Sequence, residues 1–157
     1  MEYPNTYLRG ISSDDIQFLN PPINGSDIRI PTLNVFSGGF YPNEARQDDF
    51  EELSINWIDD ECAFDVAFNQ INPKKDTYQF RGGVGVYDLC KLKSIVSNPM
   101  YNGVLGYERA PIPDNQYHGN ILMRKDVATD KSMKSIKYMI CASIAVDCIE
   151  VKKNPNI

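Results

Sequence analysis

The chain of 157 residues contains a single histidine, His118. It follows a loop stiffened by Pro111 and Pro113 and directly precedes an apolar run that begins at Gly119. An imidazole changes its protonation state near neutral pH, so it is the side chain that most often carries general acid–base chemistry. A rigid loop beside a strand can aim such a group. We therefore take His118 as the candidate acid or base, and the alternative is an imidazole that only fixes the loop.

A serine beside a base can act as a nucleophile, and Ser54 is the serine we pair with His118. The segment 53–58 alternates apolar and polar residues, which is the period of a strand with one buried face. Leu53 and Trp57 then lie on the buried face, whereas Ser54 and Asn56 lie on the other. The pairing predicts nucleophilic chemistry, with Asn56 as a binding residue. Ser and Asn on a strand surface also serve simple solvation, which is the alternative.

The residues around His118 predict further contacts to a ligand. On a strand, Tyr117 and Ile121 share one face, and His118 and Asn120 share the other. Tyr117 and Asn120 are the polar groups nearest to the histidine. We expect both to bind substrate if His118 is catalytic.

The segment Tyr7-Leu8-Arg9-Gly10 resembles the opening strand of ADP-ribosyltransferases. The resemblance implies that Arg9 clamps an anionic dinucleotide and that Glu108 or Glu61 is the later catalytic acid. It covers four residues, and Phe36-Ser37-Gly38 is all that stands for the family's Ser-Thr-Ser strand. An Arg9 buried against a carboxylate is the alternative.

Cofactor and metal motifs are not recognised in the sequence. The glycines of 82–85 precede a helix that begins with an acidic cap, and their spacing is not that of a phosphate loop. Zinc and iron sites usually show closely spaced ligand pairs, and the four cysteines form no such pair. We expect no cofactor and no metal, and we expect three of the thiols to be core residues. The cysteines are Cys62, Cys90, Cys141 and Cys148, of which the first three are the expected core thiols.

Composition is that of a soluble globular domain, with 42% hydrophobic and 24% charged residues. The net charge of −5 argues against generic affinity for nucleic acid. No apolar run approaches the roughly 20 residues that span a bilayer. Scattered cysteines without a Cys-x-x-Cys pair, and a start without the layout of a secretory signal, lead us to expect reduced thiols in a cytoplasmic protein with no membrane partner. The even cysteine count leaves a disulfide framework as the alternative.

The hydrophobic pattern predicts an α+β fold with one domain over residues 1–151 and a disordered tail over 152–157. We expect a mostly antiparallel sheet packed against a C-terminal helix and one shorter helix. Asp88 is expected to cap the shorter helix and Thr129 the C-terminal one, and Ser13 a brief helix over 14–19. The expected strands cover 53–58, 78–87, 103–108 and 119–124, and the expected helices 88–97 and 130–145. In residues 62–69 the spacing of Ala63 and Val66 predicts a helix, and the alternation of Phe64 and Phe68 leaves a strand as the alternative.

Two functions are consistent with these features. The acidic segment 48–65 and the lysines of 131–137 form complementary charges that favour a protein-interaction or regulatory module. Its partner would be another protein or a second copy of the chain. The alternative is a small enzyme acting on a nucleotide-type or other polar ligand, with His118 as acid or base, Arg9 as anion clamp, and Ser54 and Glu108 in the catalytic set.

Overall fold

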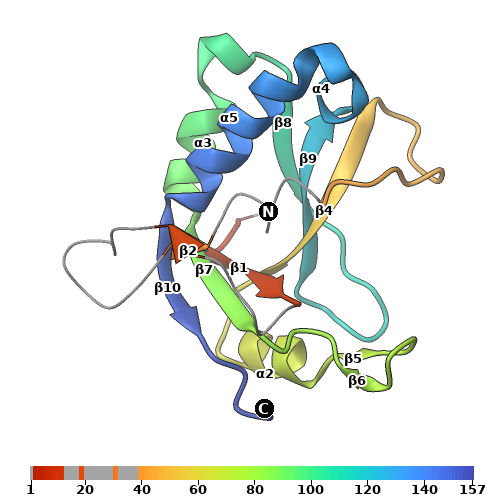
Figure 1. Cartoon of the computed structure of the whole chain (residues 1–157), viewed down its shortest axis with the longest axis vertical. Coiled ribbons are helices and arrows are strands. Elements are labelled where there is room, and N and C mark those ends of the chain that lie inside the picture. The colour runs from red at the N-terminus through yellow and green to blue at the C-terminus, as the bar shows by residue number, and fades with distance from the viewer. Residues whose placement is uncertain (1, 13–17, 20–29, 32–38) are drawn as a thin grey trace.

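The computed structural model of the chain describes residues 2–12, 18–19, 30–31 and 39–157. Its centre is a six-stranded sheet in the order β10-β7-β1-β4-β9-β8, in which each neighbouring pair is antiparallel (Figure 1). Two further sheets have two strands each. The central strands are β1 (Thr6–Ile11), β4 (Phe50–Trp57), β7 (Gly83–Asp88), β8 (Leu105–Arg109), β9 (His118–Arg124) and β10 (Cys148–Lys152); the small sheets pair β2 (Phe18–Leu19) with β3 (Ile30–Pro31) and β5 (Ile71–Asn72) with β6 (Thr77–Tyr78).

Helices cover the two faces of the central sheet unequally (Figure 1). One face, which we call the helix face, packs against α3 (Leu89–Val96), α4 (Lys125–Thr129) and α5 (Lys134–Ala145). Two 3₁₀ turns, η2 (Pro99–Tyr101) and η3 (Lys131–Met133), precede β8 and α5 respectively. Among the helices of the described residues, α2 (Cys62–Asn69) is the one that packs on the opposite face. This arrangement confirms the predicted α+β fold with a C-terminal helix and a shorter one.

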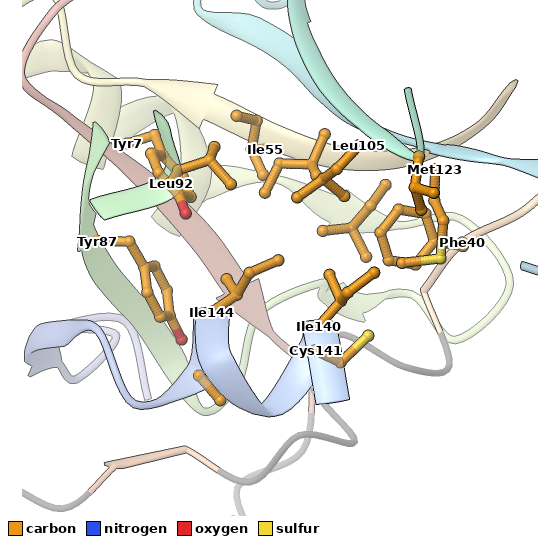
Figure 2. Packing of buried hydrophobic residues seen from close by; sticks show 14 of the residues in the cluster. Tyr7, Phe40, Ile55, Tyr87, Leu92, Leu105, Met123, Ile140, Cys141 and Ile144 are labelled. Atoms are coloured by element: carbon orange, nitrogen blue, oxygen red, sulfur yellow. The ribbon is translucent and has the colours of Figure 1, made fainter. Parts of the chain in front are cut away.

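Alternation along the strands builds the main core. Leu53, Ile55 and Trp57 of β4 are almost completely buried on the helix face, as their spacing predicts. Figure 2 shows Ile140 and Ile144 of α5 directed toward the strand residues of this cluster. Their spacing of four residues places both on one side of the helix, which explains why this side is buried.

The second face has a smaller apolar cluster under α2. Ala63, Phe64, Ala67 and Phe68 recur at helical spacing and are buried against Leu8, Val84 and Val86 of the sheet. The cluster covers only the part of the face formed by β1 and β7. The remainder of this face, over β4, β9 and β8, carries mainly polar side chains, among them Ser54, Asn56, Glu108 and Asn120.

Helix starts agree with the sequence in one place and differ in another. The Asp88 side chain accepts a hydrogen bond from Cys90 N and caps α3 as predicted. Thr129 instead ends α4, and Asp130 caps the turn that leads into α5. The Asp130 side chain accepts a hydrogen bond from Ser132 N, whereas α4 and α5 begin without a side-chain cap.

One predicted helix lies mostly outside the described residues, and one predicted strand is interrupted by a turn. The helix expected over 14–19 falls largely on 14–17, outside the described residues, while Phe18–Leu19 form the strand β2. The segment Phe36-Ser37-Gly38 also lies outside them. The single strand expected over 78–87 is two strands, β6 and β7, because a turn at Arg81–Gly82 separates them.

The end of the chain differs from the disordered tail expected from the sequence. The Asn154 side chain is buried and donates hydrogen bonds to the main-chain oxygens of Phe68 and Phe80. Asn156 donates a further bond to Phe68 O. The two amides satisfy carbonyl groups at the end of α2 and before β7, so the C-terminus lies beside α2 (Figure 1).

The thiols differ from expectation in two positions. Cys62 and Cys90 are exposed, whereas Cys141 and Cys148 are buried. Cys62 and Cys90 lie in the first turns of α2 and α3 on the side that faces solvent, a position that the apolar neighbours in the sequence do not reveal. Burial raises the pKa of both Cys141 and Cys148 to about 11. Within the described ranges, no helix has the length and apolar content needed to cross a bilayer.

Candidate functional site

A cleft of about 820 Å³ lies beside α2 on the polar part of the second face. Its floor is formed by β1 and β4. The end of α2 and the following strand line one side, and the proline loop of residues 110–117 lines the other. The lining residues that carry the argument are Tyr41, Ser54, Asn56, Asp65, Asp114, Asn115 and His118.

The floor exists because β1 and β4 diverge. They pair only at Tyr7–Trp57 and Leu8–Asn56, whereas β1 pairs with β7 along its whole length. Beyond that point, the Arg9 guanidinium donates a hydrogen bond of 2.8 Å to the main-chain oxygen of Ser54. Burial lowers the pKa of Arg9 from its usual value. Arg9 therefore bridges two strands and fixes the backbone of Ser54.

The orientation of His118 is determined by the proline loop. Ala110 N donates to His118 O, and His118 Nδ1 lies 2.7 Å from Ala110 O. A carbonyl oxygen can only accept, so Nδ1 carries the hydrogen. In the neutral imidazole, Nε2 is then the acceptor. The residue before a proline is biased toward extended backbone, and Ala110 precedes Pro111.

The Ser54 hydroxyl lies between two partners. Its Oγ is 3.2 Å from His118 Nε2 and 2.9 Å from the Tyr41 hydroxyl. With Nε2 as acceptor, Ser54 donates to His118, and Tyr41 donates to Ser54. The three side chains form a directed chain of hydrogen bonds, which we call the relay: Tyr41 to Ser54 to His118, ending at Ala110 O.

Asn56 holds the proline loop against the sheet. It lies directly across from His118 in the β4–β9 pair. Its Oδ1 accepts a 2.8 Å hydrogen bond from Asn115 Nδ2, and Asn115 Oδ1 accepts from Tyr117 N. Both asparagines are buried to at least nine tenths. The paired amides therefore fix the position of the loop that carries Ala110 O.

A separate charged cluster lies farther along the same face. Arg46 Nη1 contacts Glu52 at 2.9 Å and Glu108 at 2.7 Å, and its Nη2 contacts Asp48 at 2.7 Å. Asn120 Nδ2 also donates to Glu108. The hydrogen bond from Arg46 lowers the pKa of Asp48, and these carboxylates raise the pKa of Arg46. Glu108 Oε2 therefore accepts from both Arg46 and Asn120 within this cluster.

The expected pair of Arg9 and Glu108 is not brought together. β4 and β9 separate β1 from β8, so the two strands are about 14 Å apart at the ordinary strand spacing. Arg9 donates to Ser54 O, and Glu108 accepts from Arg46 and Asn120. Neither lines the cleft described above. The catalytic set expected from the sequence is therefore reduced to Ser54 and His118 as neighbours.

Tyr117 and Asn120 also lie outside the cleft lining. The Tyr117 ring joins the apolar cluster under α2, and its hydroxyl donates to Asp60, which raises the Tyr117 pKa. The prediction that Tyr117 shares a face with Ile121 is wrong, because β9 begins only at His118. Asn120 is buried and donates to Glu108, and its Oδ1 has no hydrogen-bond partner among the described residues.

Sequence reasoning missed several cleft residues. Tyr41 precedes Pro42 and belongs to no periodic apolar pattern, so the sequence does not mark it as a site residue. Asn115 lies within the proline loop that introduces His118, and an asparagine in a turn often hydrogen bonds to the main chain. The carbonyl of Ala110 has no side-chain signature at all. Of these, Asn115 was the one that turn chemistry could have found.

Acidic groups dominate the charge of the lining. Asp65 and Asp114 are exposed at the cleft, and the lining residues identified among the described parts of the chain include no Lys or Arg. Nor do any three His, Cys, Asp or Glu side chains within those parts gather as they would to hold a metal ion.

Comparison with protein-family models, with curated proteins and with solved structures finds no match to the chain.

Proposed function

We propose that the cleft binds a small, polar, uncharged or cationic molecule. The observation that carries this proposal is the lining: a hydroxyl relay, several carboxamides and two carboxylates around a cavity of about 820 Å³. Cavities of roughly 300–1,000 Å³ are typical of sites for small molecules. Apolar contacts come from Leu8, Ile55 and Phe80.

The charge of the lining selects among ligands. Asp65 and Asp114 repel phosphate and carboxylate groups, and no cation of the described lining compensates them. A nucleotide-type ligand held by Arg9 is therefore not favoured, because Arg9 serves Ser54 O. Carboxamides such as Asn56, Asn69 and Gln70 offer donors and acceptors that suit hydroxyl, amide or amine groups.

The interaction or regulatory module expected from the sequence is the second candidate. It is supported by exposed apolar side chains, Tyr138 and Met139 on α5 and Ile149 on β10. The β10 edge, however, carries a register shift at Ile149 and the charged pair Glu150–Lys152, which disfavour pairing with another sheet. More observations support ligand binding in the cleft than docking at this surface, so we favour the cleft.

His118 supplies a direct test, because its ring protons are the only histidine signals in a proton NMR spectrum. We expect polyols, amides or primary amines from a small library to shift these signals, and inorganic phosphate and nucleotides to leave them unchanged. The double variant Asp65→Asn, Asp114→Asn should extend binding to anions. Asp76→Asn, away from the cleft lining, is the control.

Two results would contradict the proposal. One is a library in which only anions perturb His118; the other is a full library without any perturbation. Sedimentation of the same sample tests the module: a concentration-dependent dimer with an unresponsive cleft would favour the second candidate.

A further inference from the structure

The relay has the arrangement that a serine nucleophile requires. Ser54 Oγ lies 3.2 Å from His118 Nε2, and a third group, Ala110 O, accepts from Nδ1 at 2.7 Å. A nucleophile, a base within hydrogen-bond reach and a group that orients the base are the three parts of nucleophilic catalysis. In this chain a main-chain carbonyl takes the place of the carboxylate that orients the base in the familiar triad.

We infer that Ser54 and His118 hydrolyse uncharged carboxylic esters by acyl transfer. This inference rests on the proposed cleft, because the ester must occupy it. The half-buried Ser54 lines the cleft, so its hydroxyl is open to a ligand there. The acidic lining excludes free carboxylate or phosphate substrates, which leaves neutral acyl compounds.

The reaction balances with water as co-reactant. Ser54 Oγ forms a bond to the ester carbonyl carbon while its proton passes to His118 Nε2, and Ala110 O stabilises the imidazolium through Nδ1–H. The carbon–oxygen bond to the alcohol then breaks, and the alcohol leaves with the proton from Nε2. Water attacks the acyl-serine, gives a proton to Nε2, and the acid departs as Ser54 recovers its proton.

Tyr41 is placed to stabilise the charge that develops on the carbonyl oxygen. Its hydroxyl is 2.9 Å from Ser54 Oγ, within the volume where the tetrahedral intermediate forms. Once Ser54 Oγ is bonded to carbon, the Tyr41 O–H is released to donate to the oxyanion. Removing one such donor typically costs a hundredfold or more in rate, on the order of 10²–10³.

Arg9 acts on the nucleophile through the backbone. Its hydrogen bond to Ser54 O holds the strand at the point where β1 and β4 separate. We assign Arg9 a positioning role. Arg9→Lys should therefore lower the acylation rate, while the pH profile that reports His118 keeps its shape.

The test uses the full chain with p-nitrophenyl acetate and, separately, with a neutral fluorophosphonate. We expect one adduct in the intact mass, mapped to Ser54 by peptide sequencing, and a burst of p-nitrophenol equal to the protein concentration. Ser54→Ala and His118→Gln should both abolish the adduct, and Tyr41→Phe should slow acylation about a hundredfold. Ser94→Ala, an exposed serine on α3, is the matched control.

The results separate this inference from the proposed function. An adduct on another residue, or an unchanged burst in Ser54→Ala, overturns the inference. So does a folded wild type, verified by circular dichroism, that gives no adduct while neutral ligands still shift the His118 signals; the cleft then binds without acyl transfer. Loss of both adduct and ligand response overturns the cleft as well.

Discussion

The two faces of the central sheet are built from the same strands but serve different purposes. One face forms the apolar core, and the other borders the cleft. On the helix face, Leu53, Trp57 and Ile121 are fully buried in one large apolar cluster. On the cleft face, Ser54 and His118 hydrogen bond to each other, Asn56 accepts from Asn115, and all of them border a cavity.

The difference shows where stability and chemistry reside in this fold. Burial of apolar area is worth about 25 cal/mol per Å², so the helix face supplies most of the folding free energy. Hydrogen bonds that replace bonds to water contribute only about 1 kcal/mol each. The cleft face therefore gives up stability in return for polar groups that remain within reach of a ligand.

Leu53 and Ser54 allow the sharpest comparison, because they are adjacent and point to opposite faces. We expect Leu53→Ala to lower the free energy of unfolding by about 2–5 kcal/mol, since it leaves a cavity in the main cluster. Ser54→Ala should cost about 1 kcal/mol, the value of its hydrogen bonds. Urea unfolding followed by Trp57 fluorescence measures both.

Equal losses in the two variants would contradict this division of labour. Ile55→Ala, which is on the same face as Leu53, serves as the control that must behave like Leu53→Ala.

The same alternation shows how much of the fold was predictable. The period of two in residues 53–57 assigns the buried face of β4, and the apolar spacing of Ile140 and Ile144 assigns the buried side of α5. What local patterns do not contain is the order β10-β7-β1-β4-β9-β8, which depends on contacts between distant segments. Strand order was therefore beyond prediction from one sequence.

The sequence predicts only those site residues that are marked by their side-chain type and their neighbours in the chain. A lone histidine after a proline loop, and a serine on a polar strand face, identify His118 and Ser54, and the structure places them in contact. The orienting group is a main-chain carbonyl and Tyr41 comes from an irregular loop, so neither leaves a pattern. Arg9 was read as a ligand clamp because a sequence cannot show that β1 and β4 diverge beside it.

The charged cluster on the cleft face gives the second prediction. Arg46→Met leaves the nearly buried Glu52 carboxylate without its cation and should lower the free energy of unfolding by about 2 kcal/mol at neutral pH. The exposed pair Arg124–Asp126 is the control, and Arg124→Met should cost less than about 1 kcal/mol.

The pH dependence of the free energy of unfolding tests the same cluster around Arg46. The pKa of Asp48 is lowered in the folded chain, so its pairing with Arg46 stabilises above the ordinary Asp pKa and is lost as the pH falls through the lowered value. The gap in stability between wild type and Arg46→Met should therefore narrow in urea titrations as the pH falls below about 4. A gap that is constant with pH would mean that Arg46 contributes by packing alone.

The smallest expected change in stability comes from removing the aspartates that accept hydrogen bonds at the starts of α2 and α3. Asp88 caps α3 on the helix face through Cys90 N, and Asp60 accepts from Cys62 N at the start of α2 and from the Tyr117 hydroxyl. Replacing either by Ala should cost about 1 kcal/mol. Only Asp60→Ala should also shift the His118 ring signals, because α2 lines the cleft and α3 does not. Equal shifts in both variants would show that the two faces are coupled, and that the cleft depends on the core beneath it.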